Sequence, residues 1–357
     1  IILLTYLLDI AFSLKHIKFI MSRSFKTFLK HTAKDFHNHS VNPPVVRAST
    51  IIFKSMNDIR RTQAKYKRDP RGGYFDYGRQ GTSTTHILQK ILTKLEESYH
   101  VFLTPTGFGS VFLAIFSIVR PGDEILTADP VYNPTRMLTQ DYLTEYGIKT
   151  TFYNPHDLNS IKKNITKKTK LIFVENPGSN TFEFQDLSKI ISIAKKNKIL
   201  TAIDNTWATP YFFKPIKLGF DMSIVSATKY YSGHSDVMGG SLAVNQKVFK
   251  HVEKAQKITG LRLGPDDAYL ITRGLRTLDV RLDKHQENAK KVAAFLSRNK
   301  KVKLLYPYKK GSFNYKMWKK YYSGASGLMG LKIKAKNKKS VIKFVNSLKL
   351  FGYGYSW

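Results

Sequence analysis

Short apolar segments alternate with helical patterns between residues 82 and 226, and this alternation limits the possible folds more than any other feature. The apolar segments predict strands over 100–103, 124–127, 149–152, 170–174, 199–204 and 222–226. The segments between them predict helices over 88–95, 114–119, 136–146 and 187–196. Such an alternation is typical of a mostly parallel sheet with helices on both faces. The sequence therefore predicts an α/β fold whose ligands bind at the carboxyl ends of the strands.

The chain outside this alternating region divides into three further parts. Residues 1–20 are apolar, but their lysines follow the apolar stretch, which is not the order of a secretory signal. Because the first methionine is Met21, we expect residues 1–20 to be a spurious leader. Residues 21–81 are polar and predict an N-terminal arm, extended near 42–53. A large domain follows over 82–275, and a long helix near 278–295 introduces a smaller C-terminal α/β domain over 276–357.

Composition excludes several classes of site and partner. The chain has no cysteine, which excludes disulfides, thiolate metal sites and cysteine nucleophiles. Its net charge of +34 suggests a polyanion partner, but 45 of the 59 basic residues are lysine, whereas nucleic-acid surfaces favour arginine. We therefore predict a solvated surface and no nucleic-acid partner. No apolar run is long enough to cross a bilayer, so no membrane partner is predicted. No metal-ligand spacing is present.

Reactive and anion-binding residues gather where the predicted strands end. The segment 106-TGFGS-110 precedes a helix, where backbone N–H groups can approach an anion. Asp204 ends another apolar strand. A carboxylate there needs a cationic or N–H partner, because burying an unpaired charge is costly. Lys229 follows the strand at 222–226, after Ser226 and Thr228. By itself this lysine has three interpretations: a side chain that reaches solvent, an ion-pair partner, or an amine nucleophile in a pocket.

Together these residues match the requirements of pyridoxal 5′-phosphate. Its phosphate needs backbone donors and hydroxyl groups, and its aldehyde needs an amine. Its pyridine nitrogen needs a carboxylate that keeps the nitrogen protonated. Tyr132, in 130-PVYNP-134, is a candidate for stacking on the ring. The combination favours a pyridoxal-phosphate site, although each residue alone has an ordinary structural explanation.

Four motifs carry a resemblance to a known family. They are 77-YGRQGT-82, 202-AIDNTW-207, 226-SATKY-230 with 233-GHSD-236, and 272-TRGLRTL-278. With these motifs, residues 45–357 resemble the Cys/Met-metabolism family of fold-type I pyridoxal-phosphate enzymes. The resemblance implies a mostly parallel, seven-stranded sheet flanked by helices.

The resemblance also implies roles for individual residues. Lys229 would form a Schiff base with the cofactor and move the substrate α-proton. Asp204 would pair with the ring nitrogen, and Tyr132 would stack on the ring and assist catalysis. The phosphate would be held by four residues of this chain and two from a neighbouring subunit. These are Ser226, Thr228, Gly107 and Phe108, with Tyr77 and Arg79 from the neighbour. Tyr77 would also take part in catalysis.

The family's chemistry implies β-elimination of L-cystathionine to homocysteine, pyruvate and ammonia, a step of methionine biosynthesis and transsulfuration. The closing Ser356-Trp357 resembles the β-lyase branch, whereas γ-acting relatives usually have Ser-Leu, and these two residues are the predicted substrate contacts. A γ-acting enzyme remains an alternative. The family pattern continues beyond Trp357 to an arginine that binds the substrate carboxylate. We therefore also expect a truncated small domain, and a cofactor-binding remnant with impaired turnover is a further alternative. A cytoplasmic homotetramer is implied.

Overall fold

The computed structural model describes residues 25–30, 40–307 and 310–357 of the chain. The expected leader at 1–20 and the expected start at Met21 lie outside the described residues. Within them, no helix combines the length and the apolar character needed to cross a membrane.

A seven-stranded sheet forms the centre of the molecule. Its strands are β1 (His100–Thr104), β2 (Glu124–Ala128), β3 (Lys149–Tyr153), β4 (Thr169–Glu175), β5 (Leu200–Asp204), β6 (Met222–Ser226) and β7 (Gly240–Val244). They lie in the order β1-β7-β6-β5-β4-β2-β3. The strands from β6 to β3 are parallel, and β7 is antiparallel to both β6 and β1. The predicted α/β class and mostly parallel sheet are confirmed.

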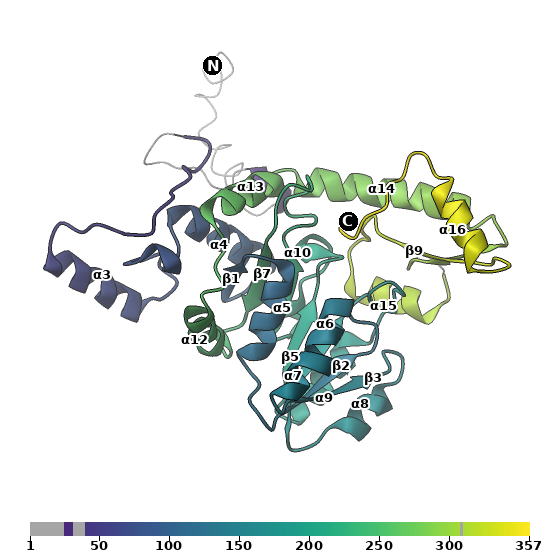
Figure 1. Cartoon of the computed structure of the whole chain (residues 1–357), viewed down its shortest axis with the longest axis horizontal. Helices are drawn as coiled ribbons and strands as arrows, with labels where there is room; N and C mark the ends of the chain where they lie inside the picture. The colour runs from purple at the N-terminus through teal and green to yellow at the C-terminus, as the bar shows by residue number, and fades with distance from the viewer. Residues whose placement is uncertain (1–24, 31–39, 308–309) are drawn as a thin grey trace, which may run out of the picture.

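Helices enclose this sheet (Figure 1), and the neighbouring strands β1 and β7 are buried at every residue. The helices before the last unit are α4 (Ser83–Glu96), α5 (Gly107–Phe116), α6 (Asn133–Met137), α7 (Leu143–Glu145), α8 (Leu158–Asn164), α9 (Leu187–Lys196), α10 (Thr209–Phe212), α11 (Pro215–Leu218), α12 (Phe249–Thr259) and α13 (Pro265–Leu275). A π-helical turn, η3 (Leu138–Tyr142), joins α6 to α7. The helix predicted over 187–196 is confirmed as α9. The helix predicted over 114–119 begins earlier, at Gly107, and ends at Phe116.

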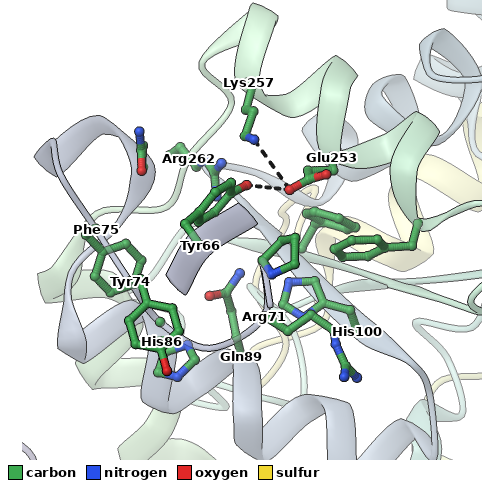
Figure 2. A pocket seen from close by; sticks show the side chains of 15 residues that line it. Tyr66, Arg71, Tyr74, Phe75, His86, Gln89, His100, Glu253, Lys257 and Arg262 are labelled. Carbon is green, nitrogen blue, oxygen red and sulfur yellow. Dashed lines mark hydrogen bonds and ion pairs between the residues drawn. The ribbon is translucent and has the colours of Figure 1, made fainter. Parts of the chain in front are cut away.

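The arm contains a helix that the sequence did not predict. Helix α3 (Met56–Arg68) buries none of its residues and is rich in charged side chains, so its composition is that of an exposed polar segment. Figure 1 shows α3 projecting from the body of the molecule, and the short α2 (Phe25–Lys30) and η2 (Gly78–Gln80) complete the described arm. The Tyr66 hydroxyl of α3 donates a hydrogen bond to Glu253 of α12. This contact lies beside a small cavity between the arm and the body (Figure 2).

The last part of the chain forms a second, smaller sheet. Its elements are α14 (Leu278–Leu296), β8 (Val302–Leu305), α15 (Phe313–Tyr321), β9 (Gly330–Ile333) and α16 (Lys338–Asn346). The long helix predicted over 278–295 is confirmed as α14. Strands β8 and β9 pair antiparallel, and this unit lies beside the carboxyl ends of the inner parallel strands (Figure 1).

Candidate active site

A cavity of about 240 Å³ opens at the carboxyl ends of β4, β5 and β6. The residues that end or follow these strands and line it are Glu175, Pro177, Gly178, Ser179, Asn180, Phe182, Asp204, Thr206, Trp207, Ser226 and Lys229. Tyr132 lines it from the loop after β2, and Leu328, Met329, Gly330, Tyr355 and Trp357 line it from the C-terminal unit. Four of the predicted cofactor residues, Lys229, Asp204, Ser226 and Tyr132, therefore line one cavity.

The Lys229 amine lies between the sheet and the C-terminal segment. Its Nζ atom is 2.5 Å from the Ser356 Oγ atom and 5.4 Å from the centre of the Trp357 ring. Burial lowers the pKa of Lys229 below its usual value, and the nearby Asp204 carboxylate partly offsets this effect. A lowered pKa increases the neutral fraction of the amine, which is the form that can act as a nucleophile or base.

Asp204 ends β5 with its carboxylate held by the residues that follow it. The Thr206 N–H donates to its Oδ1 atom at 2.9 Å. Burial raises the pKa of Asp204, while the Thr206 hydrogen bonds and the Lys229 charge act in the opposite direction. A partly buried carboxylate in this position favours a cationic partner such as a protonated ring nitrogen.

The N-terminus of α5 provides the predicted anion cradle. The Thr106 hydroxyl accepts a hydrogen bond from the Gly109 N–H at 2.8 Å. Within the described part of the chain, the Gly107 and Phe108 N–H groups have no acceptor. A Cβ atom on Gly107 would come within 2.4 Å of the Ser226 Oγ atom. The absence of a side chain at Gly107 therefore brings two free N–H donors close to a hydroxyl, which suits a phosphate group.

Other predicted residues lie around this cradle or away from it. The Thr228 hydroxyl accepts from the Gly239 N–H at 3.0 Å, so it fixes the turn after β6. Tyr77 is exposed and lies outside the cavity. Arg79 also lies outside it and donates to the Lys257 carbonyl at 2.9 Å. Among the residues that the structure describes, no guanidinium group lines the cavity.

Glu175 is a cavity residue that the sequence interpretation did not include. It ends β4 as Asp204 ends β5, and the two residues are direct partners in the register of these strands. The same signal that identified Asp204, a carboxylate at the end of an apolar strand, is present in 171-LIFVE-175. No cluster of His, Asp and Glu suited to a metal ion occurs among the residues that the structure places.

Comparison with known proteins gives the same assignment as the site. A profile of the family described as Cys/Met metabolism PLP-dependent enzyme matches residues 26–357. This chain belongs to that family. The family resemblance predicted from the motifs is therefore confirmed, and the cofactor of the Cys/Met metabolism enzymes is pyridoxal phosphate.

Relatives within the Cys/Met metabolism family differ in their reactions. A putative cystathionine beta-lyase of Rhizobium johnstonii is 36% identical over 345 residues, which cover 95% of this chain and 85% of the relative. An L-alanine/L-glutamate racemase of Wolbachia pipientis is 33% identical, with coverage of 93% and 84%. The solved structure of cystathionine gamma synthase from Xanthomonas oryzae, in complex with aminoacrylate and cysteine, aligns with a TM-score of 0.84. Its sequence is 27% identical to this chain, and the alignment covers 93% of this chain and 84% of that structure.

The residues present fit the family's cofactor. The free N–H groups at α5 and the Ser226 hydroxyl suit its phosphate, the Lys229 amine suits its aldehyde, and the Asp204 carboxylate suits its ring nitrogen. Tyr132 lines the same cavity with an exposed ring. Gly107 approaches Ser226 so closely that no Cβ atom could be accommodated, and this approach sets the free N–H groups beside the Ser226 hydroxyl, as a phosphate site requires.

Proposed function

We propose that this Cys/Met metabolism enzyme is a carbon–sulfur lyase that converts L-cystathionine into homocysteine, pyruvate and ammonia by β-elimination. The observation that carries this proposal is the position of Ser356 and Trp357 beside the Lys229 amine. The Trp357 ring also packs against Tyr230, with 5.2 Å between the ring centres. This contact helps to hold Ser356 and Trp357 next to the lysine. The Ser-Trp sequence resembles the β-lyase branch of the family, and the similarity to the Rhizobium protein supports the same reaction.

Lys229 is the residue that moves protons in this proposal. Bound pyridoxal phosphate supplies an electron sink for the charge that develops at the substrate Cα atom. The Lys229 amine, whose pKa is lowered by burial, takes the proton as the Cα–H bond breaks. A Cα–Cβ double bond then forms as the Cβ–S bond breaks. The protonated Lys229 can donate its proton to the thiolate that leaves. Hydrolysis of the three-carbon enamine product accounts for pyruvate and ammonia.

The other cavity residues hold the reacting groups in place. Asp204 would keep the ring nitrogen protonated, because the Thr206 hydrogen bonds and the Lys229 charge favour its ionised form. Tyr132, which lines the cavity from the loop after β2, would stack on the ring. The Ser356 hydroxyl oxygen accepts a hydrogen bond from the Lys229 amine, and Trp357 lines the same side of the cavity. Together these contacts orient the substrate for removal of the α-proton.

The experiment that tests the reaction is a product analysis with L-cystathionine. Purified protein reconstituted with pyridoxal phosphate is expected to release pyruvate and homocysteine in equal amounts. Lys229→Ala is expected to release neither product, while a substitution of the exposed Lys247 is the matched control. Release of 2-ketobutyrate and cysteine in place of pyruvate would assign a γ-acting enzyme and contradict the β-lyase proposal.

A second candidate reaction is amino-acid racemisation. It is favoured by the similarity to the Wolbachia racemase, which has nearly the same coverage as the Rhizobium protein. In this reaction the proton taken by Lys229 is replaced at Cα and no Cβ bond breaks. Chiral chromatography of L-alanine and L-glutamate after incubation separates the two candidates, because only a racemase yields the D-enantiomers.

We also propose that Tyr77 and Arg79 act in the site of a neighbouring copy within a homotetramer. No guanidinium group from the described part of this chain lines the cavity, whereas arginine is well suited to binding a phosphate dianion. Tyr77 is exposed, with Arg79 at 5.6 Å from its ring centre. An exposed aromatic surface on α5 and its neighbours, which includes Phe116, Tyr142 and Tyr146, supports contact with another copy.

Mixed oligomers test this shared site. Arg79→Ala and Lys229→Ala homo-oligomers are each expected to be inactive. Refolded mixtures of the two are expected to regain part of the activity, because one site then receives both native residues. Mixtures that stay inactive while forming tetramers would contradict the shared site. The predicted cytoplasmic location is checked by fractionation of the source cells.

A further inference from the structure

Two carboxylates lie side by side at the edge of the cavity. Glu175 and Asp204 are direct register partners at the ends of the parallel strands β4 and β5, and both line the same space. Adjacent parallel strands are about 4.8 Å apart, and partners in register point to the same face. Two carboxylates this close, partly shielded from water, are not both ionised without a large cost.

The surroundings of Asp204 stabilise a negative charge better than the surroundings of Glu175 do. Asp204 receives hydrogen bonds from Thr206, and the Lys229 charge also favours its ionised form. Glu175 receives a hydrogen bond from the Tyr132 N–H and has Ser179 nearby, and no basic side chain of the described residues is among the groups that stabilise its charge. Burial and the Asp204 charge raise the pKa of Glu175 well above its usual value. The other titratable groups that line the cavity are Tyr132, Tyr355 and Lys229. The proton of the pair therefore belongs on Glu175.

Glu175 is also attached to the segment that carries the ring-stacking tyrosine. Its Oε2 atom accepts from the Tyr132 N–H at 2.6 Å. A second contact joins the same two loops, because the Ser179 N–H donates to the Pro130 carbonyl at 2.6 Å. A Cβ atom on Gly178 would come within 2.6 Å of Pro130, so the two loops approach as closely as their backbones allow. The Glu175 side chain thus fixes the backbone from which the Tyr132 ring extends.

We propose that Glu175 is a positioning residue that, as a neutral carboxylic acid, anchors the Tyr132 backbone over the cofactor ring and leaves Asp204 as the charged member of the pair. The neutral form avoids a second negative charge next to Asp204, so the protonated ring nitrogen meets one carboxylate. This inference rests on cofactor binding by the family and not on which substrate bond is broken. Its tests therefore measure the cofactor and the carboxyl group, and a wrong β-lyase assignment would leave them unchanged.

Two substitutions test whether Glu175 acts through its hydrogen bond to the Tyr132 backbone or through a negative charge. Glu175→Gln keeps the shape and an accepting oxygen but cannot ionise, and Glu175→Ala removes the anchor. Glu145→Gln is the control, because Glu145 is exposed and lies outside the cavity. The measurements are the Kd of pyridoxal phosphate for the apoprotein, the pH titration of the bound cofactor's absorption, and the circular dichroism of each variant. Infrared spectra of the apoprotein at neutral pH report a protonated carboxyl group directly.

Glu175→Gln is expected to match the unmodified protein in Kd and in the pH titration, and to lose a protonated-carboxyl infrared band. Glu175→Ala is expected to retain the fold and to bind the cofactor about tenfold more weakly, the effect of one lost anchoring hydrogen bond. The proposal is overturned if Glu175→Gln shifts the titration or weakens binding as much as Glu175→Ala does. It is equally overturned if Glu175→Ala binds the cofactor normally, or if no infrared band is lost.

Discussion

The Lys229 Nζ atom lies 2.5 Å from the Ser356 Oγ atom, across a separation of more than a hundred residues in the sequence. The contact joins the turn after β6 to the C-terminal segment and places the amine at the wall of the cavity. In the proposed chemistry the Lys229 amine reacts with the aldehyde of the cofactor. The hydrogen bond between Lys229 and Ser356 must therefore be able to break.

Covalent attachment of the cofactor to Lys229 is the first prediction. Borohydride reduction of the cofactor-loaded protein is expected to fix the cofactor on the peptide that contains Lys229, because its amine is the one in the cavity. Mass spectrometry of the digest locates the label. Lys247→Ala is expected to keep the label in place, and a label found on any other lysine would refute the assignment.

A single methyl group at Gly107 is expected to weaken cofactor binding. The Cβ atom of Gly107→Ala would lie 2.4 Å from the Ser226 Oγ atom and 3.0 Å from its Cα atom, so the cradle has to open. Overpacking of this kind costs about 1–3 kcal/mol, or roughly five- to a hundredfold in Kd. Titration of apoprotein with pyridoxal phosphate measures the change. Gly264→Ala is the control, since no atom lies within 4 Å of its added Cβ, and equal effects of both substitutions would argue against the cradle.

Glu96 is expected to make the protein less stable as the pH rises. It is fully buried, accepts a hydrogen bond from Tyr231 at 3.2 Å, and burial raises its pKa to about 8. Between its usual pKa of 4.5 and about 8, the folded chain retains a proton that the unfolded chain releases. The stabilisation is therefore complete below the unfolded pKa and is lost as the pH rises, by up to about 1.4 kcal/mol per pH unit.

Glu96→Gln is expected to remove this loss, so that the variant is more stable than the unmodified protein at alkaline pH. Urea unfolding over a series of pH values measures the difference. Glu145→Gln, at an exposed position, serves as the control. Parallel pH profiles for Glu96→Gln and the unmodified protein would show that Glu96 is not a buried neutral acid.

His100 is expected to contribute to acid unfolding. Its buried ring packs edge to face on Phe102 and Phe249, and burial lowers its pKa to about 3. As the pH falls below the usual value of 6.5, the unfolded chain binds a proton that the folded chain excludes until about pH 3. Stability therefore falls with pH across this window, by up to about 1.4 kcal/mol per unit.

His100→Phe keeps an aromatic ring without a titrating group, so its stability is expected to fall less steeply in acid. Thermal unfolding between pH 7 and pH 4 measures the slope of stability against pH. His251→Gln, at an exposed position, is expected to retain the original slope. An unchanged slope for His100→Phe would assign the acid sensitivity to other groups.

The sequence predicted those parts of the fold that depend on local patterns. Apolar strands and the helix α9 have clear periodicity, so their positions follow from short windows of sequence. Strand β7 was not predicted, because 240-GSLAV-244 begins at the second of two glycines and its short apolar part directly follows a glycine-rich turn. Its antiparallel orientation follows from long-range pairing with β1 and β6, which no local pattern encodes.

The sequence also predicted part of the active site. Lys229, Asp204, Ser226 and Tyr132 follow strands, so their convergence was expected from the topology of an α/β sheet. The anchoring of Tyr132 by Glu175 depends on the close approach of two loops and could not be derived from spacing. The contact of Ser356 with Lys229 depends on how the C-terminal unit packs against the large sheet, and such packing is a property of the assembled core.

The pairing of β1 with β7 has a consequence for synthesis of the chain. His100 pairs with Val244, so the partner of β1 leaves the ribosome roughly 140 residues later, a delay on the order of ten seconds. During that interval the apolar strand 100–104 has an open edge that can capture other nascent chains. Chaperone assistance at this stage would therefore influence the yield of folded enzyme more strongly than changes to its mature surface.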